Sequence, residues 1–160
     1  MRASACLLLL LAFVSAGCGP TVDLTKGLQV TVVSTGWFDL GIVNGQTKLV
    51  PTVSFTLKNV SDQKLVTLQI NALFRRAGEN DEWGSAFLTA IGSEGLAPGA
   101  STPPLTAKSQ LGYTGSDQTR AEMLANTHFV DARVQLFAKY GPTQWVKVGE
   151  FPIVRELLTK

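Results

Sequence analysis

Most of the chain beyond residue 27 alternates between apolar and polar side chains. The alternation is clearest over residues 49–57, 66–74 and 130–139, and shorter or weaker stretches occur over residues 28–32, 83–91, 105–113 and 144–149. A period of two places the apolar members on one face of a strand, which is typical of an antiparallel sheet with one buried face. The pattern therefore predicts about seven short strands.

Turn-forming residues separate these runs. The segments 59–63 (Asn-Val-Ser-Asp-Gln) and 140–144 (Tyr-Gly-Pro-Thr-Gln) are predicted to close hairpins, and residues 77–81 to end a strand. Pro51 lacks a backbone N–H, so we expect it at a strand start or on a sheet edge. A single helix is predicted over residues 116–126, with Ser116 or Asp117 as its cap.

Many short strands with one short helix predict an all-β fold in which two antiparallel sheets pack face to face. An immunoglobulin-like β-sandwich is the first choice for residues 27–160, as a single domain. A small barrel or a small α+β sheet domain with the helix across one face is the alternative. The Cys…Trp…Cys spacing of antibody domains is absent from the sequence.

Three segments resemble a known family of domains. They are residues 55–65 (FTLKNVSDQKL), the strand that follows them, and residues 96–101 (LAPGAS). Their order is similar to that of FxLYD-type immunoglobulin-like domains of exported bacterial proteins, although the FxLYD string itself is absent. The resemblance covers about residues 48–112. It implies a β-sandwich, and it implies no catalytic residues.

The first 20 residues have a different character. Arg2 precedes an apolar stretch of ten residues, 5–14, and Ser-Ala-Gly follows it. A membrane-spanning helix needs about 20 apolar residues. The stretch instead has the length of the apolar region of a signal peptide, which is commonly about 7–15 residues and ends in small residues. We therefore expect the protein to be exported.

The stretch Val14-Ser-Ala-Gly-Cys18 resembles the lipobox of bacterial lipoproteins. In that family the cysteine thiol is acylated, with chains such as palmitate, and the cysteine becomes the mature N-terminus. The lipobox usually has Leu where this chain has Ser15, and an ordinary signal peptide is the alternative. The resemblance implies a signal peptide over residues 1–17, lipid on Cys18 and a flexible tether over residues 18–26.

The charge of the chain bears on its expected partners, and its cysteine content bears on its expected disulfides. The chain has 14 Lys and Arg against 12 Asp and Glu, and nucleic acid binding needs a concentrated basic surface. We therefore expect no nucleic acid partner. Cys6 lies within the leader, so the mature chain would keep only Cys18. No disulfide is then expected in the domain.

The sequence offers few candidates for catalysis or metal binding. His128 is the one histidine, and Asp131 three residues later would face the opposite side of a strand. Glu79, Asp81 and Glu82 lack the order of a calcium loop. We therefore predict no catalytic residue, no metal site and no cofactor, and a protein that is not an enzyme.

Four aromatic residues are the candidates for a partner-binding patch. Phe129 and Phe137 fall on the polar side of the strand predicted over residues 130–139, and Trp83 and Trp145 lie near turns. Aromatic side chains are favoured at binding surfaces. The alternative is that the second sheet or the helix covers these residues as part of the core.

Together these features predict a lipid-anchored protein of the bacterial cell envelope that faces the periplasm. Gly19, rather than Asp, after the cysteine favours the outer membrane by the sorting rule of such lipoproteins. Its partners would be membrane lipid, through acylated Cys18, and another envelope protein that it binds or helps to assemble. The alternative is a periplasmic carrier of small ligands or lipids, which needs an enclosed apolar cavity of about 300 Å³ or more.

Overall fold

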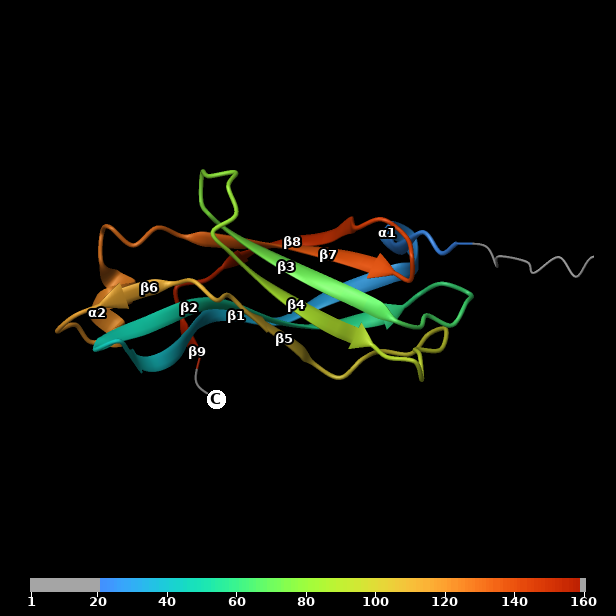
Figure 1. Cartoon of the computed structure of the whole chain (residues 1–160), viewed down its shortest axis with the longest axis horizontal. Helices are drawn as coiled ribbons and strands as arrows, with labels where there is room; N and C mark the ends of the chain where they lie inside the picture. The colour runs from blue at the N-terminus through green and yellow to red at the C-terminus, as the bar shows by residue number, and fades with distance from the viewer. Residues whose placement is uncertain (1–20, 159–160) are drawn as a thin grey trace, which may run out of the picture.

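The computed structural model describes residues 21–158, so Cys18 and the leader lie outside the described residues. Two sheets, antiparallel except for the short β9, which pairs with β1 in parallel, pack face to face along the long axis of the molecule (Figure 1). The strands are β1 (Leu28–Val43), β2 (Gln46–Asn59), β3 (Leu68–Arg76), β4 (Gly84–Ile91), β5 (Leu105–Lys108), β6 (Tyr113–Gly115), β7 (Ala132–Tyr140), β8 (Val146–Ile153) and β9 (Leu157–Leu158). The helices are α1 (Leu24–Gly27) and α2 (Arg120–Ala125).

The strand order is immunoglobulin-like. One sheet runs β5-β2-β1-β9, with β6 also paired to β2, and the other runs β4-β3-β7-β8. The first, second and fifth strands thus share one sheet, as they do in immunoglobulin domains. The predicted all-β sandwich is confirmed, and the α+β alternative is wrong. Nine strands and two helices occur in the described residues, instead of about seven and one, because β6, β9 and α1 are too short to show a period.

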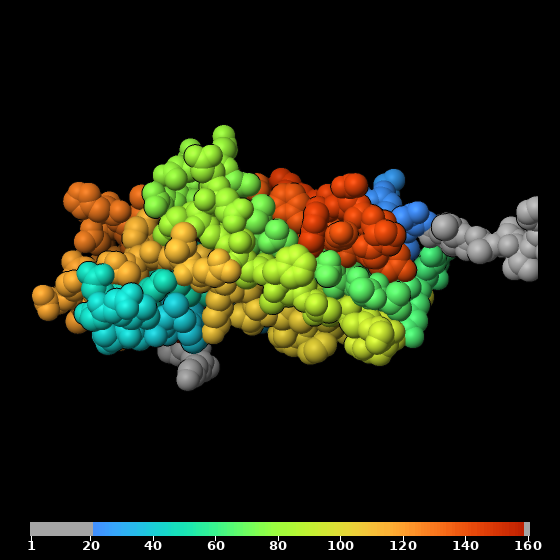
Figure 2. All heavy atoms as spheres, viewed as in Figure 1, coloured from blue at the N-terminus to red at the C-terminus, as the bar shows by residue number. Residues whose placement is uncertain are grey.

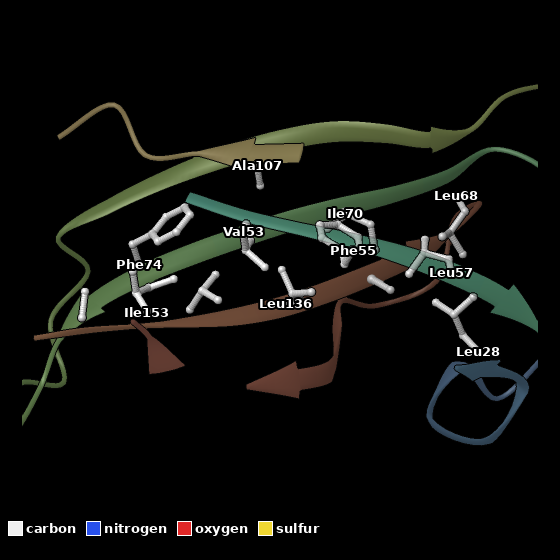
Figure 3. Close-up of a cluster of buried hydrophobic side chains, with 14 of the residues drawn as sticks. Leu28, Val53, Phe55, Leu57, Leu68, Ile70, Phe74, Ala107, Leu136 and Ile153 are labelled. Carbon is white, nitrogen blue, oxygen red and sulfur yellow. The ribbon is translucent and has the colours of Figure 1, made fainter. Parts of the chain in front are cut away.

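The core lies between the two sheets and follows the predicted alternation. In β3, Leu68, Ile70, Ala72 and Phe74 are fully buried, while the odd-numbered residues between them are partly exposed on the outer side. Figure 3 shows Phe55 and Val53 of β2 among these side chains. Burial of alternate residues from both sheets is what holds the sandwich together, since each buried aliphatic or aromatic side chain contributes about 1.5–3 kcal/mol.

The segment after Asn59 is a crossover between the sheets and not the predicted hairpin, because β2 and β3 belong to different sheets. The buried Asn59 organises it by donating from its side-chain amide to the carbonyl oxygens of Gln63 (2.8 Å) and Leu96 (2.9 Å). The second predicted hairpin, at residues 140–144, is confirmed, because it joins the antiparallel neighbours β7 and β8.

Pro51 occupies the middle of β2, which is a central strand, and not the predicted strand start or edge. It lies where the neighbour of β2 changes from β5, paired with residues 52–55, to β6, paired with residues 47–49. The Pro51 carbonyl accepts a hydrogen bond from the Ser109 N–H (3.0 Å). The interruption between β5 and β6 explains how a residue without an N–H fits inside a sheet.

The folded domain begins earlier than the predicted boundary at residue 27. Leu24 is only 3% exposed and belongs to the core, and Val22 packs against it. The Asp23 side chain caps α1 by accepting a hydrogen bond from the Thr25 N–H (3.0 Å). At least the C-terminal part of the predicted tether, residues 22–26, is therefore part of the domain.

The second helix, α2, starts later than predicted. Thr119 is its cap instead of Ser116 or Asp117, because Thr119 and Glu122 form a capping box. The Glu122 N–H donates to the Thr119 hydroxyl (3.2 Å), and the Thr119 N–H donates to the Glu122 carboxylate (2.7 Å). Buried Met123 anchors the helix to the sandwich. The helices lie at opposite ends of the long axis, α1 at the end where the described chain begins and α2 beside β6 (Figure 1).

Candidate functional site

The structure separates the four predicted aromatic residues into two groups. Trp83 and Phe129 join Trp37 and Tyr113 in an inner cluster near α2. Phe137 and Trp145 belong to the outer side of the β4-β3-β7-β8 sheet. The single patch that the sequence suggested does not exist, and the two groups are considered separately below.

Phe129 belongs to the core and not to an exposed patch. It is 5% exposed, and its ring centroid lies 4.5 Å from Trp37 and 4.3 Å from Tyr113. The prediction was wrong because β7 begins only at Ala132, so the strand alternation does not extend back to residue 129. The irregular backbone instead turns Phe129 inward and leaves Val130 37% exposed.

Arg155 and Tyr113 hold this irregular segment in place. The Arg155 guanidinium donates to the Asp131 carboxylate (2.6 Å) and to the Phe129 carbonyl oxygen (2.8 Å). The Tyr113 hydroxyl accepts from the Val130 N–H (2.9 Å). Trp83 is partly buried and packs on Trp37 with ring centroids 6.1 Å apart. The inner cluster is therefore a structural element that closes the α2 end of the sandwich.

A pocket of about 280 Å³ lies beside α2 and opens to solvent. Tyr113, Met123 and Phe129 provide its apolar lining, and Asn126 and His128 its polar lining. His128 is exposed and does not form a catalytic pair with Asp131, whose carboxylate is held by Arg155. The pocket differs from the enclosed cavity that a carrier needs, because it is open to solvent. Buried apolar side chains of both sheets pack between the sheets (Figure 3).

An ion pair attaches α2 to β1. The Arg120 guanidinium donates to the Asp39 carboxylate (2.8 Å), and the Gly41 N–H donates to the same side chain (2.7 Å). Partial burial alone would raise the pKa of Asp39, but these hydrogen bonds and the Arg120 charge hold the pKa below its usual value of 3.8. A lowered pKa means that the ionised carboxylate stabilises the folded state at neutral pH.

We expect Asp39→Asn to lower the free energy of unfolding by up to about 1 kcal/mol near neutral pH, since both partners are partly exposed and screened by water. The folded-state pKa is depressed, so this difference should shrink as the pH falls from about 5 to about 2. Urea unfolding at several pH values measures it, with Asp62→Asn in the exposed β2–β3 segment as the control. A difference that does not change with pH would contradict the assignment.

The second aromatic group forms an exposed surface, which we call the outer aromatic surface and define as Phe87, Phe137, Lys139 and Trp145. Phe87 is 57% exposed and Trp145 37%, and their ring centroids lie 5.6 Å apart at a steep angle of 76°. The Lys139 ammonium lies 5.9 Å from the Trp145 ring centroid. Phe87 and Phe137 share one side of the sheet, because both pair with Asn71 of β3.

Polar side chains border this surface on the same sheet. Glu150 of β8 accepts hydrogen bonds from Gln135 (2.9 Å) and Lys147 (3.1 Å), and its carboxylate lies 3.4 Å from Arg133. The hydrogen bond from Gln135, with the contact to Lys147, lowers the pKa of Glu150. An apolar centre with a hydrogen-bonded polar margin is typical of protein interfaces.

Sequence reasoning missed Phe87 as a member of this surface. Its neighbours Ala86 and Leu88 are also apolar, so the sequence Gly-Ser-Ala-Phe-Leu-Thr-Ala-Ile shows no clear alternation. Only the pairing of β4 with β3 places Phe87 on the outer side. Phe137, in contrast, is predicted from the sequence to be outside, because it falls on the same side of the strand as Asp131, Arg133 and Gln135.

Comparisons with known proteins identify no family. No family model matches the chain, and no curated protein matches it. Among solved structures, the chain is similar to the X-ray structure of Northeast Structural Genomics Consortium target SoR45, with 13% sequence identity and a TM-score of 0.45 over 81% of this chain and 88% of that chain. Between residues 21 and 158, no helix has the length and apolar character needed to cross a membrane.

Proposed function

We propose that the protein is a lipid-anchored, non-enzymatic binding module of the bacterial cell envelope. The anchor is supported by the leader and by Cys18 in its lipobox-like context. The binding role is supported above all by the outer aromatic surface, in which Phe87 and Trp145 are exposed beside a polar margin. Tryptophan is enriched among the residues that dominate protein-binding energies.

The anchor would hold the domain close to the bilayer. Val22 already packs against the core, so only four residue steps separate it from Cys18. A fully extended chain of that length spans about 14 Å. The α1 end of the sandwich would therefore lie near the headgroups, and the long outer face of the β4-β3-β7-β8 sheet would be available to another envelope protein.

A carrier of small ligands is the second candidate, and the pocket beside α2 favours it. The pocket combines the apolar side chains of Met123 and Phe129 with the polar groups of Asn126 and His128. Its volume of about 280 Å³ is slightly below the range of about 300–1,000 Å³ that is usual for small-molecule sites. Because the pocket is open to solvent, it would leave much of a ligand exposed, and we therefore rank the binding module first.

A photo-crosslinking amino acid at position 137 tests the binding module. In intact cells, the variant with the crosslinker in place of Phe137 should yield a discrete adduct with another envelope protein after illumination. The control carries the same crosslinker in place of Thr31, which is exposed on β1 of the other sheet. Adducts that are the same from both positions, or absent from position 137, would contradict a specific partner on the outer aromatic surface.

A further inference from the structure

Among residues 21–158, strand β4 has a hydrogen-bonded neighbour strand on one side only, so it forms a free edge of its sheet. It pairs with β3 on one side, and it ends the strand order β4-β3-β7-β8. An edge strand offers a row of unpaired N–H and C=O groups, to which another strand can add by main-chain hydrogen bonds. Figure 2 shows the residues of β4, in yellow-green, on the surface at the front of the molecule.

The register identifies which main-chain N–H and C=O groups of β4 point away from β3, toward the free edge. The Ala77 N–H donates to the Asp131 carbonyl oxygen (2.6 Å), in register with the β3–β7 pairing. Hydrogen-bonded pairs alternate along an antiparallel ladder, so the odd-numbered residues of β3 bond to β7 and the even-numbered ones to β4. The Phe74 carbonyl oxygen accepts a hydrogen bond from the Trp83 N–H (2.9 Å). It therefore points toward the β4 side, as this alternation requires of an even-numbered residue of β3.

The same alternation continues in β4. Gly84, Ala86 and Leu88 pair with the even-numbered residues of β3 and so direct their main-chain groups toward it. The N–H and C=O groups of Ser85, Phe87 and Thr89 therefore point away from β3, toward the free edge. Three successive hydrogen-bonding positions are thus available to an added strand.

The two edges of this sheet are protected differently. Natural proteins guard edge strands with charges, prolines and bulges. The opposite edge strand, β8, contains Lys147, Glu150, Pro152 and a register shift. In β4, the segment from Gly84 to Thr89 contains none of these devices, and its one register shift falls beyond Thr89. The edge formed by β4 is therefore the less protected of the two.

We propose that β4 pairs with β4 of a second copy of the chain, antiparallel about a two-fold axis at Phe87. Phe87 would then face its own counterpart, and Ser85 of each copy would lie opposite Thr89 of the other. All three outward-facing positions would be hydrogen-bonded, and two four-stranded sheets would join into one of eight strands.

The charge of the strand favours this self-pairing. Like charges directly opposite each other destabilise a strand pair, and residues 84–91 carry no charge at all. The axis is perpendicular to the sheet, so the two outer aromatic surfaces would lie on the same side and meet at Phe87. The inferred dimer depends on neither the anchor nor the partner of the proposed function.

The test measures the mass of the full chain in detergent by light scattering, for the parent and two matched variants. Thr89→Lys places a charge on the free edge, while Thr31→Lys makes the same change at an exposed residue of β1. We expect the parent and Thr31→Lys to have about twice the monomer mass, and Thr89→Lys to have the monomer mass. A monomeric parent, or a Thr89→Lys variant that stays dimeric, overturns the proposal.

A disulfide test locates the axis. Residues of a hydrogen-bonded antiparallel pair have Cα atoms about 5.5 Å apart, which suits a disulfide. Oxidised Phe87→Cys should therefore yield a covalent dimer, and Thr31→Cys should yield no more than the parent, which shares Cys6 and Cys18 with both variants. Equal crosslinking in the two variants would overturn pairing about Phe87.

Discussion

Replacing Cys18 with serine is expected to abolish the incorporation of a labelled fatty acid and to move the protein from the membrane fraction to the soluble fraction. Serine is nearly isosteric with cysteine but lacks the thiol that would carry the lipid. Each buried methylene contributes about 0.8 kcal/mol, so two acyl chains anchor a protein stably where one is marginal. The ten-residue apolar stretch of the leader is too short to replace this anchor by spanning the bilayer.

Cys6→Ser is the matched control, because it makes the same atomic change inside the leader. We expect this variant to keep the fatty-acid label and the membrane fraction. A Cys18→Ser protein that still carries the label would show that the lipid is attached elsewhere. If the parent protein incorporated no labelled fatty acid, the leader would be an ordinary signal peptide and the proposed lipid anchor would be wrong.

The strands that the sequence predicted best are those with one fully buried face. The runs over residues 66–74 and 130–139 correspond to β3 (Leu68–Arg76) and β7 (Ala132–Tyr140), which are central in their sheet. A central strand of a sandwich packs its inner side against the other sheet along its whole length, so its inner residues must be apolar. The burial requirement therefore appears directly in the sequence as a period of two.

Features that depend on pairing between distant segments could not be predicted in this way. The turn residues at 59–63 suit a hairpin and a crossover equally well, and only the sheet order decides between them. Pro51 is tolerated in a central strand because the neighbouring strand is interrupted there. Phe129 departs from the alternation because irregular backbone, fixed by Arg155 and Tyr113, precedes β7.

The outer aromatic surface depends on long-range pairing in the same sense. Phe87 comes from β4 and Phe137 from β7, and β3 lies between these strands in the sheet. Trp145 lies in the connection between β7 and β8, directly before β8, and its ring centroid is 5.6 Å from that of Phe87. The sequence predicted Phe137 and Trp145 as members of one patch with Phe129 and Trp83, whereas the strand order replaces those two residues with Phe87.

Ile70→Ala is expected to lower the free energy of unfolding by about 2–5 kcal/mol, because it removes three carbon atoms from a site that closes around the vacancy only in part. Ile70 is fully buried and lies beside Phe55 in the core between the sheets (Figure 3). Phe55→Ala should cost about 3–5 kcal/mol for the same reason. Domains of this size are stable by about 5–15 kcal/mol in total, so either change would remove a large share.

Ile42→Ala is the matched control, since it removes the same atoms from a strand residue that is 66% exposed. Its cost should stay within about 0.5 kcal/mol, because the side chain is mostly in water in both states. Urea denaturation of the three variants and the parent measures these differences. Equal costs for Ile70→Ala and Ile42→Ala would mean that the β3 side chains do not form the core, and the assignment of the outward-facing residues of β3, β4 and β7 would fail with it.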